Sequence, residues 1–180
     1  MAHDRRSRRI QAGHGLTPNP SKPVSASRVT LSQLMQPQFA NLRGAVHGGW
    51  IMKLADEAGG LAAARHAQKP VVTVAIDQMS FHSPIRIGDL VILEAEVTFV
   101  GNSSLETRVQ VTAEDPLTAI RTHTNTAYLV YVALDAAGRP TRVPRLIAET
   151  EFESLRMARG ERRQADRLAR LKHEAQEAAP

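Results

Sequence analysis

The 180-residue chain contains no cysteine, which excludes disulfides, thiolate metal ligands and a cysteine nucleophile. No apolar run reaches the roughly 18 residues that a membrane-spanning helix needs. The first residues, M-A-H-D-R-R-S-R-R-I, are basic, but the apolar segment of a secretory signal peptide does not follow them. We therefore expect a cytoplasmic protein without a membrane span.

Several motifs of familiar enzyme chemistries are also missing. The histidines have neither the H-x-x-x-H nor the H-E-x-x-H spacing of zinc sites. The chain has no G-x-S-x-G elbow of serine esterases and no G-x-x-x-x-G-K-[ST] phosphate loop. We expect no metal and no separate cofactor, so any chemistry should rely on carboxylates and water.

Positive charge is concentrated at the N-terminus. Residues 1–28 contain six Lys and Arg against one acid, while the formal net charge of the whole chain is +5. A basic arm can contact nucleic acid or an anionic membrane, but no aromatic residue lies among these arginines to stack on bases. Because Pro18, Pro20 and Pro23 lie here as well, we expect residues 1–27 to be a disordered basic leader and expect no nucleic-acid partner.

The hydrophobic pattern predicts one strand, one long helix and four further strands. The helix opens at Gly48-Gly49 and covers about Trp50 to His66. Its predicted core stripe is Ile51, Leu54, Ala55, Ala58, Leu61 and Ala62. Alternating apolar residues predict strands at 29–35, 71–81, 90–100, 104–113 and 119–134. Because mostly short turns join the strands, we expect an α+β fold with a curled antiparallel sheet wrapped around one long helix.

Residues 146–180 have a different composition, rich in Ala, Glu and Arg. They predict a charged helical extension, interrupted near Gly160, that follows a main domain at residues 28–145. Its apolar stripe is thin and consists of Phe152, Leu155, Leu168, Leu171 and Ala175. Fraying in solvent is the favoured interpretation of this segment, and a short coiled-coil contact with a second subunit is the alternative.

The long helix carries an acid, Asp56, at a position where its pattern favours an apolar residue. Gly59 and Gly60 lie three and four residues further on, so another segment can approach this face closely. A carboxylate in such surroundings is poorly solvated, which makes it a stronger base. The alternative is a surface ion pair with Lys53, for which Glu57 is the better candidate. Asp56 is therefore the candidate catalytic base.

A glycine-rich turn, G-A-V-H-G-G, leads into this helix. The amides of His47 to Trp50 lie at the helix N-terminus, where they can point at a developing oxyanion. Asn41 lies in the loop before the turn, and its side-chain amide can hold a water or a carbonyl group. An asparagine that shapes its own turn is an equally good interpretation.

Two sequence blocks then show a family resemblance. N-x-x-G-x-V-H-G-G-x-I-M-K-L-x-D-E-A-G-G and V-V-T-V-A-I-D-x-M-x-F-x-x-P-I-x-x-G-D-L-V resemble the hotdog-fold acyl-CoA thioesterases. The most similar groups are the bacterial short-chain acyl-CoA hydrolases and the animal cytosolic (brain-type) acyl-CoA hydrolase. V-G-N-S-S-L-E and A-Y-L-V-Y-V-A-L-D extend the resemblance to about residues 28–147. It implies a hotdog fold and hydrolysis of acyl-CoA to a free carboxylic acid and CoA.

The resemblance also implies where the site lies. Asn41 and Asp56 would come from opposite subunits of a homodimer, and the amide of Gly49 would bind the thioester carbonyl oxygen. Such dimers often assemble into trimers of dimers. CoA, as part of the substrate, would lie along the dimer seam, which implies contacts with His47, Gly48, Gly101, Ser103 and Ser104.

Two other functions remain open at this point. Hotdog domains also serve as acyl-CoA sensors in transcription regulators, but the prolines of the leader disfavour a helix-turn-helix there. Hotdog dehydratases have a different pattern, with a histidine ahead of a helix-borne acid, whereas His47 lies in the turn. Release of free thiol from acyl-CoA would distinguish a thioesterase from both.

Overall fold

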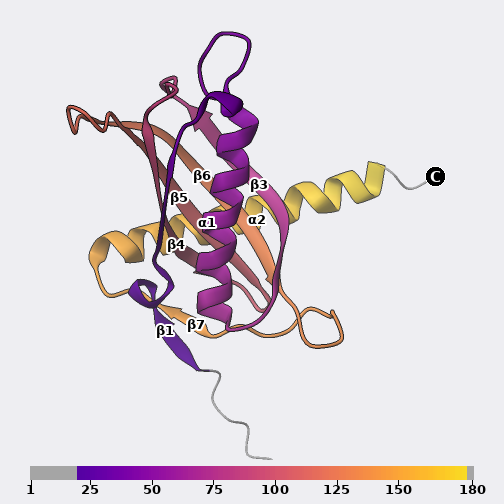
Figure 1. Cartoon of the computed structure of the whole chain (residues 1–180). Coiled ribbons are helices and arrows are strands. Elements are labelled where there is room, and N and C mark those ends of the chain that lie inside the picture. The colour runs from indigo at the N-terminus through magenta and orange to yellow at the C-terminus, as the bar shows by residue number, and fades with distance from the viewer. Residues whose placement is uncertain (1–19, 178–180) are drawn as a thin grey trace, which may run out of the picture.

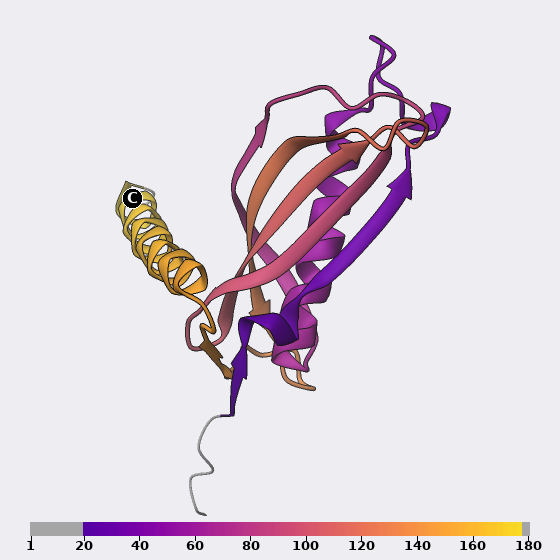
Figure 2. The same ribbon diagram turned by 90° about the vertical axis from the view of Figure 1, so that its left-hand side faces the viewer.

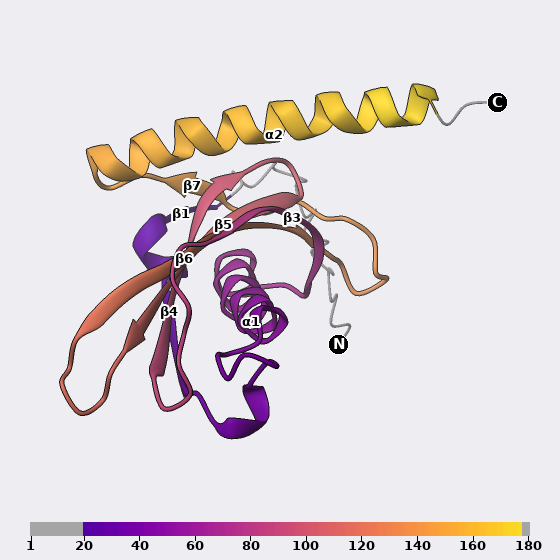
Figure 3. The same ribbon diagram turned by 90° about the horizontal axis from the view of Figure 1, so that it is seen from above.

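The computed structural model describes residues 20–177, so residues 1–19 of the predicted leader and residues 178–180 of the predicted extension lie outside it. One long helix, α1 (Gly48–Ala67), is enclosed by a sheet, and a second helix, α2 (Glu151–Glu177), lies on the other side of that sheet (Figures 1 and 3). The sheet is built from β2 (Val29–Leu34), β3 (Val71–Phe81), β4 (Leu90–Val100), β5 (Ser104–Glu114) and β6 (Arg121–Ala133).

The five strands lie in the order β2-β4-β5-β6-β3, and every neighbouring pair is antiparallel. The predicted α+β arrangement of a curled antiparallel sheet around one helix is confirmed. The observed bounds of β3 and β4 coincide with the predicted ones. Both edges of the sheet, β2 and β3, are formed by strands that directly flank α1 and its preceding loop in sequence.

The core lies between α1 and the concave face of the sheet. Its helical side is formed by Ile51, Leu54, Ala55, Ala58 and Ala62, all of which are buried as predicted. Val91, Leu93, Leu105, Val109 and Leu129 form the facing side. The prediction is wrong for Leu61, which is half exposed because it borders an open cavity beside β3 instead of facing the sheet.

The N-terminal segment is more ordered than predicted. β1 (Ser21–Pro23) pairs in parallel with β7 (Arg145–Ile147), and the 3-10 helix η1 (Val24–Ser27) follows. The Ser27 hydroxyl donates to the Val24 carbonyl at 2.7 Å and accepts the Val97 amide at 2.9 Å. The prediction of a disordered leader is therefore wrong for residues 21–27, where the buried Val24 anchors the chain.

α2 is a single unbroken helix that packs on the convex face of the sheet, opposite α1 (Figure 2). The predicted interruption at Gly160 is wrong, because this glycine is a contact point. A Cβ atom there would lie 2.7 Å from Cβ of Phe99 and 2.9 Å from Oε1 of Glu106. Arg163 binds the same Glu106 carboxylate through two hydrogen bonds of 2.9 and 2.7 Å. The favoured interpretation of a helix frayed in solvent is therefore wrong for this part of α2.

η2 (Pro37–Phe39) and an irregular loop connect β2 to α1.

Across residues 20–177, neither helix combines the length and the apolar content that crossing a membrane requires.

Candidate active site

Asp56 is held by side chains from two strands of the sheet. Its carboxylate oxygen Oδ1 accepts hydrogen bonds from the hydroxyl of Thr73 on β3, at 2.8 Å, and from the hydroxyl of Tyr131 on β6, at 3.1 Å. The Tyr131 hydroxyl also lies 3.0 Å from the backbone carbonyl oxygen of Asp56. Within the described residues Oδ2 accepts no hydrogen bond, so it is available to take a proton.

The approach of Tyr131 depends on a missing side chain. A Cβ atom on Gly59 would lie 2.6 Å from the Tyr131 hydroxyl and 2.7 Å from Oγ1 of Thr107. The predicted close approach of another segment to this glycine face is therefore confirmed. Burial, and next the neighbouring Asp56 carboxylate, raise the pKa of Tyr131 far above its usual range. The phenol thus stays protonated and acts as a donor to Asp56.

The carboxylate of Asp56 opens into a largely apolar cavity of about 540 Å³. The cavity is lined by Leu31, Asp56, Glu57, Gly60, Leu61, Val71, Thr73 and Tyr131. Glu57 forms an ion pair with Lys53, as predicted, and both side chains are about half exposed. The alternative of an Asp56–Lys53 pair is therefore wrong, and among residues 20–177 Asp56 has no cationic partner.

The N-terminus of α1 is capped by a histidine side chain. Nδ1 of His47 accepts the amide of Gly49 at 3.0 Å, which satisfies one of the free donors at the helix start. Oδ1 of Asn41 accepts the amides of Arg43 at 2.8 Å and Ala45 at 3.3 Å. The interpretation that Asn41 shapes its own turn is therefore correct for its side-chain oxygen.

A second cavity, of about 280 Å³, lies beside this helix start. It is lined by Asn41, Ala45, Val46, Gly48, Ile51, Phe81, His82, Ser83, Pro84 and Ile85. Asn41 and Gly48 thus share one cavity, whereas Asp56 lines the other. Within one chain, the structure does not bring the two halves of the predicted site together.

The predicted hairpin between β4 and β5 is present, with the amide of Gly101 donating to the Ser104 carbonyl at 2.9 Å. The amide of Ala133 donates to the Ser103 carbonyl, and Ala133 pairs with Val71 at the start of β3. The hairpin therefore lies near the C-terminal end of α1, away from the glycine turn at its N-terminal end. The predicted CoA contacts are thus divided between the two ends of α1.

Comparison with known proteins assigns this chain to a family. A model described as the thioesterase superfamily matches residues 43–120. An uncharacterized acyl-CoA thioester hydrolase of Bacillus subtilis is 37% identical over 153 residues, covering 85% of this chain and 86% of that protein. This chain belongs to the thioesterase superfamily.

Other relatives and solved structures agree with this assignment. The cytosolic acyl coenzyme A thioester hydrolase of Rattus norvegicus is 40% identical over 151 residues, covering 82% of this thioesterase-family chain and 39% of that protein. The chain thus spans about two fifths of the length of that relative. An acyl-CoA hydrolase of Staphylococcus aureus, solved with butyryl coenzyme A and coenzyme A, matches with a TM-score of 0.81 and 32% identity over 87% of this chain and 96% of that one. The hotdog fold implied by the resemblance is confirmed.

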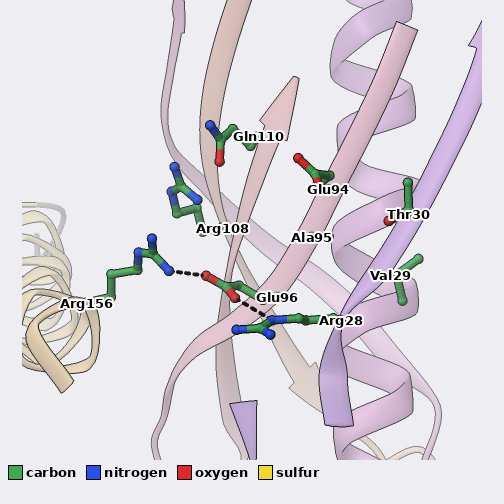
Figure 4. Close-up of a pocket in the computed structure, with 9 residues that line it drawn as sticks. All are labelled: Arg28, Val29, Thr30, Glu94, Ala95, Glu96, Arg108, Gln110 and Arg156. Carbon is green, nitrogen blue, oxygen red and sulfur yellow. Dashed lines mark hydrogen bonds and ion pairs between the residues drawn. The ribbon is translucent and has the colours of Figure 1, made fainter. Parts of the chain in front are cut away.

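A third cavity, of about 310 Å³, lies between β2, β4, β5 and α2 (Figure 4). Glu96 lies at its centre, with Oε2 3.2 Å from Nε of Arg28 and Oε1 2.7 Å from Nη1 of Arg156. None of the predicted site residues lines this cavity. Its ion pairs attach α2 and the N-terminal segment to β4, which is a structural role. Among residues 20–177, no cluster of three or more His, Asp or Glu side chains has the arrangement of a metal site.

Sequence reasoning missed Thr73 and Tyr131 as site residues of this thioesterase-family chain. Both lie in segments that read as ordinary strands, and an isolated hydroxyl in a β-rich pattern carries no signal. Gly59 offered the one indirect sign, because a bare helical face predicts a close neighbour without identifying it.

Proposed function

We propose that this chain hydrolyses acyl-CoA thioesters to a free carboxylic acid and CoA, with Asp56 as the catalytic base. The observation that carries the proposal is the half-buried Asp56 carboxylate, which Thr73 and Tyr131 orient and which opens into an apolar cavity. A carboxylate oriented in this way can take a proton from an attacking water. The rat and Bacillus subtilis relatives, both described as acyl-CoA thioester hydrolases, support the choice of substrate. The likeness to a cytosolic hydrolase of the rat supports a cytoplasmic location.

The mechanism begins with the carbonyl group of the thioester. Its oxygen accepts the amide of Gly49 at the positive end of the α1 dipole, where it replaces Nδ1 of His47 as the acceptor. Oδ2 of Asp56 takes one proton from a water while the water oxygen bonds to the carbonyl carbon. The tetrahedral intermediate then expels the CoA sulfur, which receives that proton from Asp56. The products are one carboxylic acid and one thiol.

The rival route is direct attack of the Asp56 carboxylate on the thioester, which gives a mixed anhydride that water then opens. The two routes differ in the oxygen that enters the product. In a single turnover in ¹⁸O-labelled water, the general-base route puts the label into the released acid. The anhydride route transfers an unlabelled oxygen of Asp56 to the acid when water attacks the aspartyl carbon.

Solved variants of a relative support the choice of residues. The acyl-CoA hydrolase of Staphylococcus aureus has been solved with an asparagine, an aspartate or a threonine replaced by alanine. In that chain the aspartate follows the asparagine by 15 residues and precedes the threonine by 17. Asn41, Asp56 and Thr73 have the same two spacings. This agreement supports Asn41 and Asp56 as catalytic residues and adds Thr73 as the residue that orients the carboxylate.

We also propose that the catalytic unit is a homodimer. Asn41 and Asp56 line different cavities of one chain, so a single copy does not assemble the site. β3 is an edge strand with three exposed apolar residues, whose exposed fractions are 41 to 54%: Val72, Val74 and Ile76. An apolar edge strand of this length favours pairing with another strand. The likeness to a hexameric acyl-CoA thioesterase, with 36% identity and a TM-score of 0.81, supports a trimer of such dimers.

Antiparallel pairing of two β3 strands supplies the missing halves. Phe81, at one end of β3, lines the same cavity as Asn41, and Thr73, near the other end, binds Asp56. Pairing the strands in opposite directions brings the Phe81 end of one copy beside the Thr73 end of the other. Asn41 and the Gly49 amide of one copy then face Asp56 of the partner.

The same pairing accounts for the divided CoA contacts. The hairpin of Gly101, Ser103 and Ser104 lies at the C-terminal end of α1, and His47 and Gly48 lie at its N-terminal end. Because two-fold symmetry places the C-terminal end of one helix beside the N-terminal end of the other, the hairpin of one copy lies toward the glycine turn of its partner. We propose that CoA lies between them.

The decisive experiment compares wild type with Asp56→Asn in a thiol-release assay on acyl-CoAs of increasing chain length. Loss of a general base should lower turnover by at least about 10²-fold, while the dimer and CoA binding are retained. Unchanged turnover of the variant would refute the role of Asp56. A wild-type protein that binds acyl-CoA but releases no thiol would indicate the sensor function instead.

A further inference from the structure

The C-terminal turns of α2 extend beyond the sheet. Figures 1 and 3 both show the helix passing over β3 and continuing past this edge strand. Its last anchors are Arg167, with Nε 2.9 Å from Oδ1 of Asp77, and Arg170, with Nη2 3.8 Å from the same oxygen. All ten residues from 168 to 177 are exposed. This end of α2 therefore has almost no partner among the residues that the structure describes.

A helical end that packs on nothing needs another source of stability. Isolated helices shorter than about 12–15 residues are marginal in water, and helices in proteins draw their stability from packing an apolar face. Such a face is present, because Leu168, Leu171 and Ala175 follow one another at i, i+3 and i+7. Leu168 is 48% exposed and Leu171 53% exposed. The segment 168–177 thus has the apolar stripe of a packed helix without the surface that covers it.

The stripe continues into a groove beside the edge strand. A cavity of about 380 Å³ between α2 and β3 is lined by Val74, Ala75, Ile76, Asp77, Arg167, Arg170, Leu171 and Glu174. The apolar residues of this groove include Val74 and Ile76, which belong to the edge that we propose pairs with the second copy. The uncovered end of α2 is therefore continuous with the proposed dimer seam.

The place where α2 crosses β3 determines where the two copies of α2 lie in the proposed dimer. In the proposed dimer, the Thr73 end of one β3 lies beside the Phe81 end of the other, so the two-fold axis passes close to Asp77, midway between them. Asp77 is also the residue to which Arg167 and Arg170 attach. Both copies of α2 consequently cross the seam close to the two-fold axis, one on each side of it. They run in opposite directions on the same face of the joined sheet.

We propose that the segment 168–177 of α2 is an interaction surface for the same segment of a second copy, so that the two helices pack side by side across the seam. Leu168 and Leu171 of each copy cover those of the other and close the groove above β3. The charges are complementary in this arrangement, because two antiparallel helices that cross near Arg167 and Arg170 place the acidic end of one, with Glu174 and Glu177, alongside Arg162 of the other. This proposal rests on the β3-paired dimer of the proposed function.

Site-directed cross-linking tests the contact directly, because the chain has no native cysteine. Leu168→Cys and Leu171→Cys are the test variants. Leu155→Cys is the matched control, since Leu155 lies on the same helix and is 50% exposed, but lies at the opposite end of α2. After mild oxidation at low protein concentration, both test variants should give a covalent dimer on a non-reducing gel, and the control should remain monomeric. Cross-linking at the test positions that is no faster than at Leu155 would overturn the proposal.

A second measurement gives the contribution of the α2 contact to the affinity of the dimer. The double variant Leu168→Glu/Leu171→Glu places four charges at the proposed contact, and the dimer dissociation constant from sedimentation should rise at least about 10²-fold. Leu155→Glu should leave it within about twofold. A wild-type protein that sediments as a monomer would overturn both the dimer and this contact. A dimer that neither cross-links through α2 nor weakens in the double variant would overturn the α2 contact alone and leave the proposed function intact.

Discussion

Replacing Gly59 by alanine tests whether the bare face of α1 exists to admit Tyr131. The matched control is the next residue, because a Cβ atom on Gly60 would lie 3.5 Å from the Tyr131 ring, an ordinary contact. A Cβ atom on Gly59 would lie 2.6 Å from the Tyr131 hydroxyl and 2.7 Å from the Thr107 hydroxyl. Both of those side chains are fully buried, so moving either of them aside would disrupt the close packing around it. Two neighbouring Gly-to-Ala changes in one helix should therefore have opposite effects.

The magnitudes follow from three contributions. Alanine in place of glycine stabilises a helix interior by about 1 kcal/mol, and this gain applies to both variants. Overpacking at residue 59 costs about 1–3 kcal/mol. Displacing the Tyr131 hydroxyl from the Asp56 carboxylate costs about 1.5–3 kcal/mol more. Gly59→Ala should therefore lower the free energy of unfolding by about 1.5–5 kcal/mol, whereas Gly60→Ala should raise it by up to about 1 kcal/mol.

Urea denaturation and thiol release together measure the outcome. Gly59→Ala should also lower kcat by at least about 10-fold, because Asp56 loses one of the two donors that orient it, while Gly60→Ala stays within about twofold of wild type. A Gly59→Ala protein that is as stable and as active as Gly60→Ala would refute the reasoning. It would mean that the helix and the tyrosine can move apart without consequence.

Three further predictions concern groups buried around the core. Tyr131→Phe should lower kcat about 10-fold with little change in KM in the thiol-release assay, because only the orientation of the base is affected. Burial lowers the pKa of His66, so the folded state resists protonation. The free energy of unfolding should accordingly be constant above about pH 6.5 and fall as the pH drops below it, a dependence that urea titrations should find weaker in His66→Gln. Arg163→Ala should lower the free energy of unfolding by about 3 kcal/mol in thermal denaturation, because the buried Glu106 carboxylate keeps only the Thr98 hydroxyl and the more distant Arg167, at 4.0 Å, as partners, and Arg163→Ala/Glu106→Gln should recover part of that loss.

The strands and α1 could be predicted because their physical signals are local. β4 alternates buried Val91, Leu93, Ala95 and Val97 against Ile92, Glu94, Glu96 and Thr98 on the other face, and the period of two fixes which face meets the core. The turn at Gly101 ends the strand, where the Gly101 amide donates to the Ser104 carbonyl and a Cβ atom would lie 2.6 Å from Oγ of Ser104. Each of these elements is specified by residues within a few positions of one another, so the sequence suffices.

The packing of α2 could not be predicted, because charges rather than apolar periodicity attach it. Glu96, Glu106 and Asp77 lie on the outer face of the sheet and bind Arg156, Arg163 and Arg167 of the helix. In the sequence, an outward acid on a strand and an arginine on a helix both read as solvated residues. Only the three-dimensional arrangement shows that they are partners. The same limit hid Thr73 and Tyr131, whose hydroxyls reach Asp56 from strands 17 and 75 positions away along the chain.

Complementation between two inactive variants tests the idea that Asn41 and Asp56 act across a dimer. The wild-type chain carries both residues, so a symmetric dimer has two equivalent sites, each drawing on both copies. A mixed dimer of Asn41→Ala and Asp56→Asn has one site with both substitutions and one site with neither. If the two variants are unfolded and refolded together in equal amounts, half of the dimers are mixed and half of their sites are intact. Thiol release should then reach about a quarter of the wild-type rate, although each variant alone is nearly inactive. If both residues acted within one chain, no mixture would contain an intact site, and the refolded mixture would be as inactive as its components.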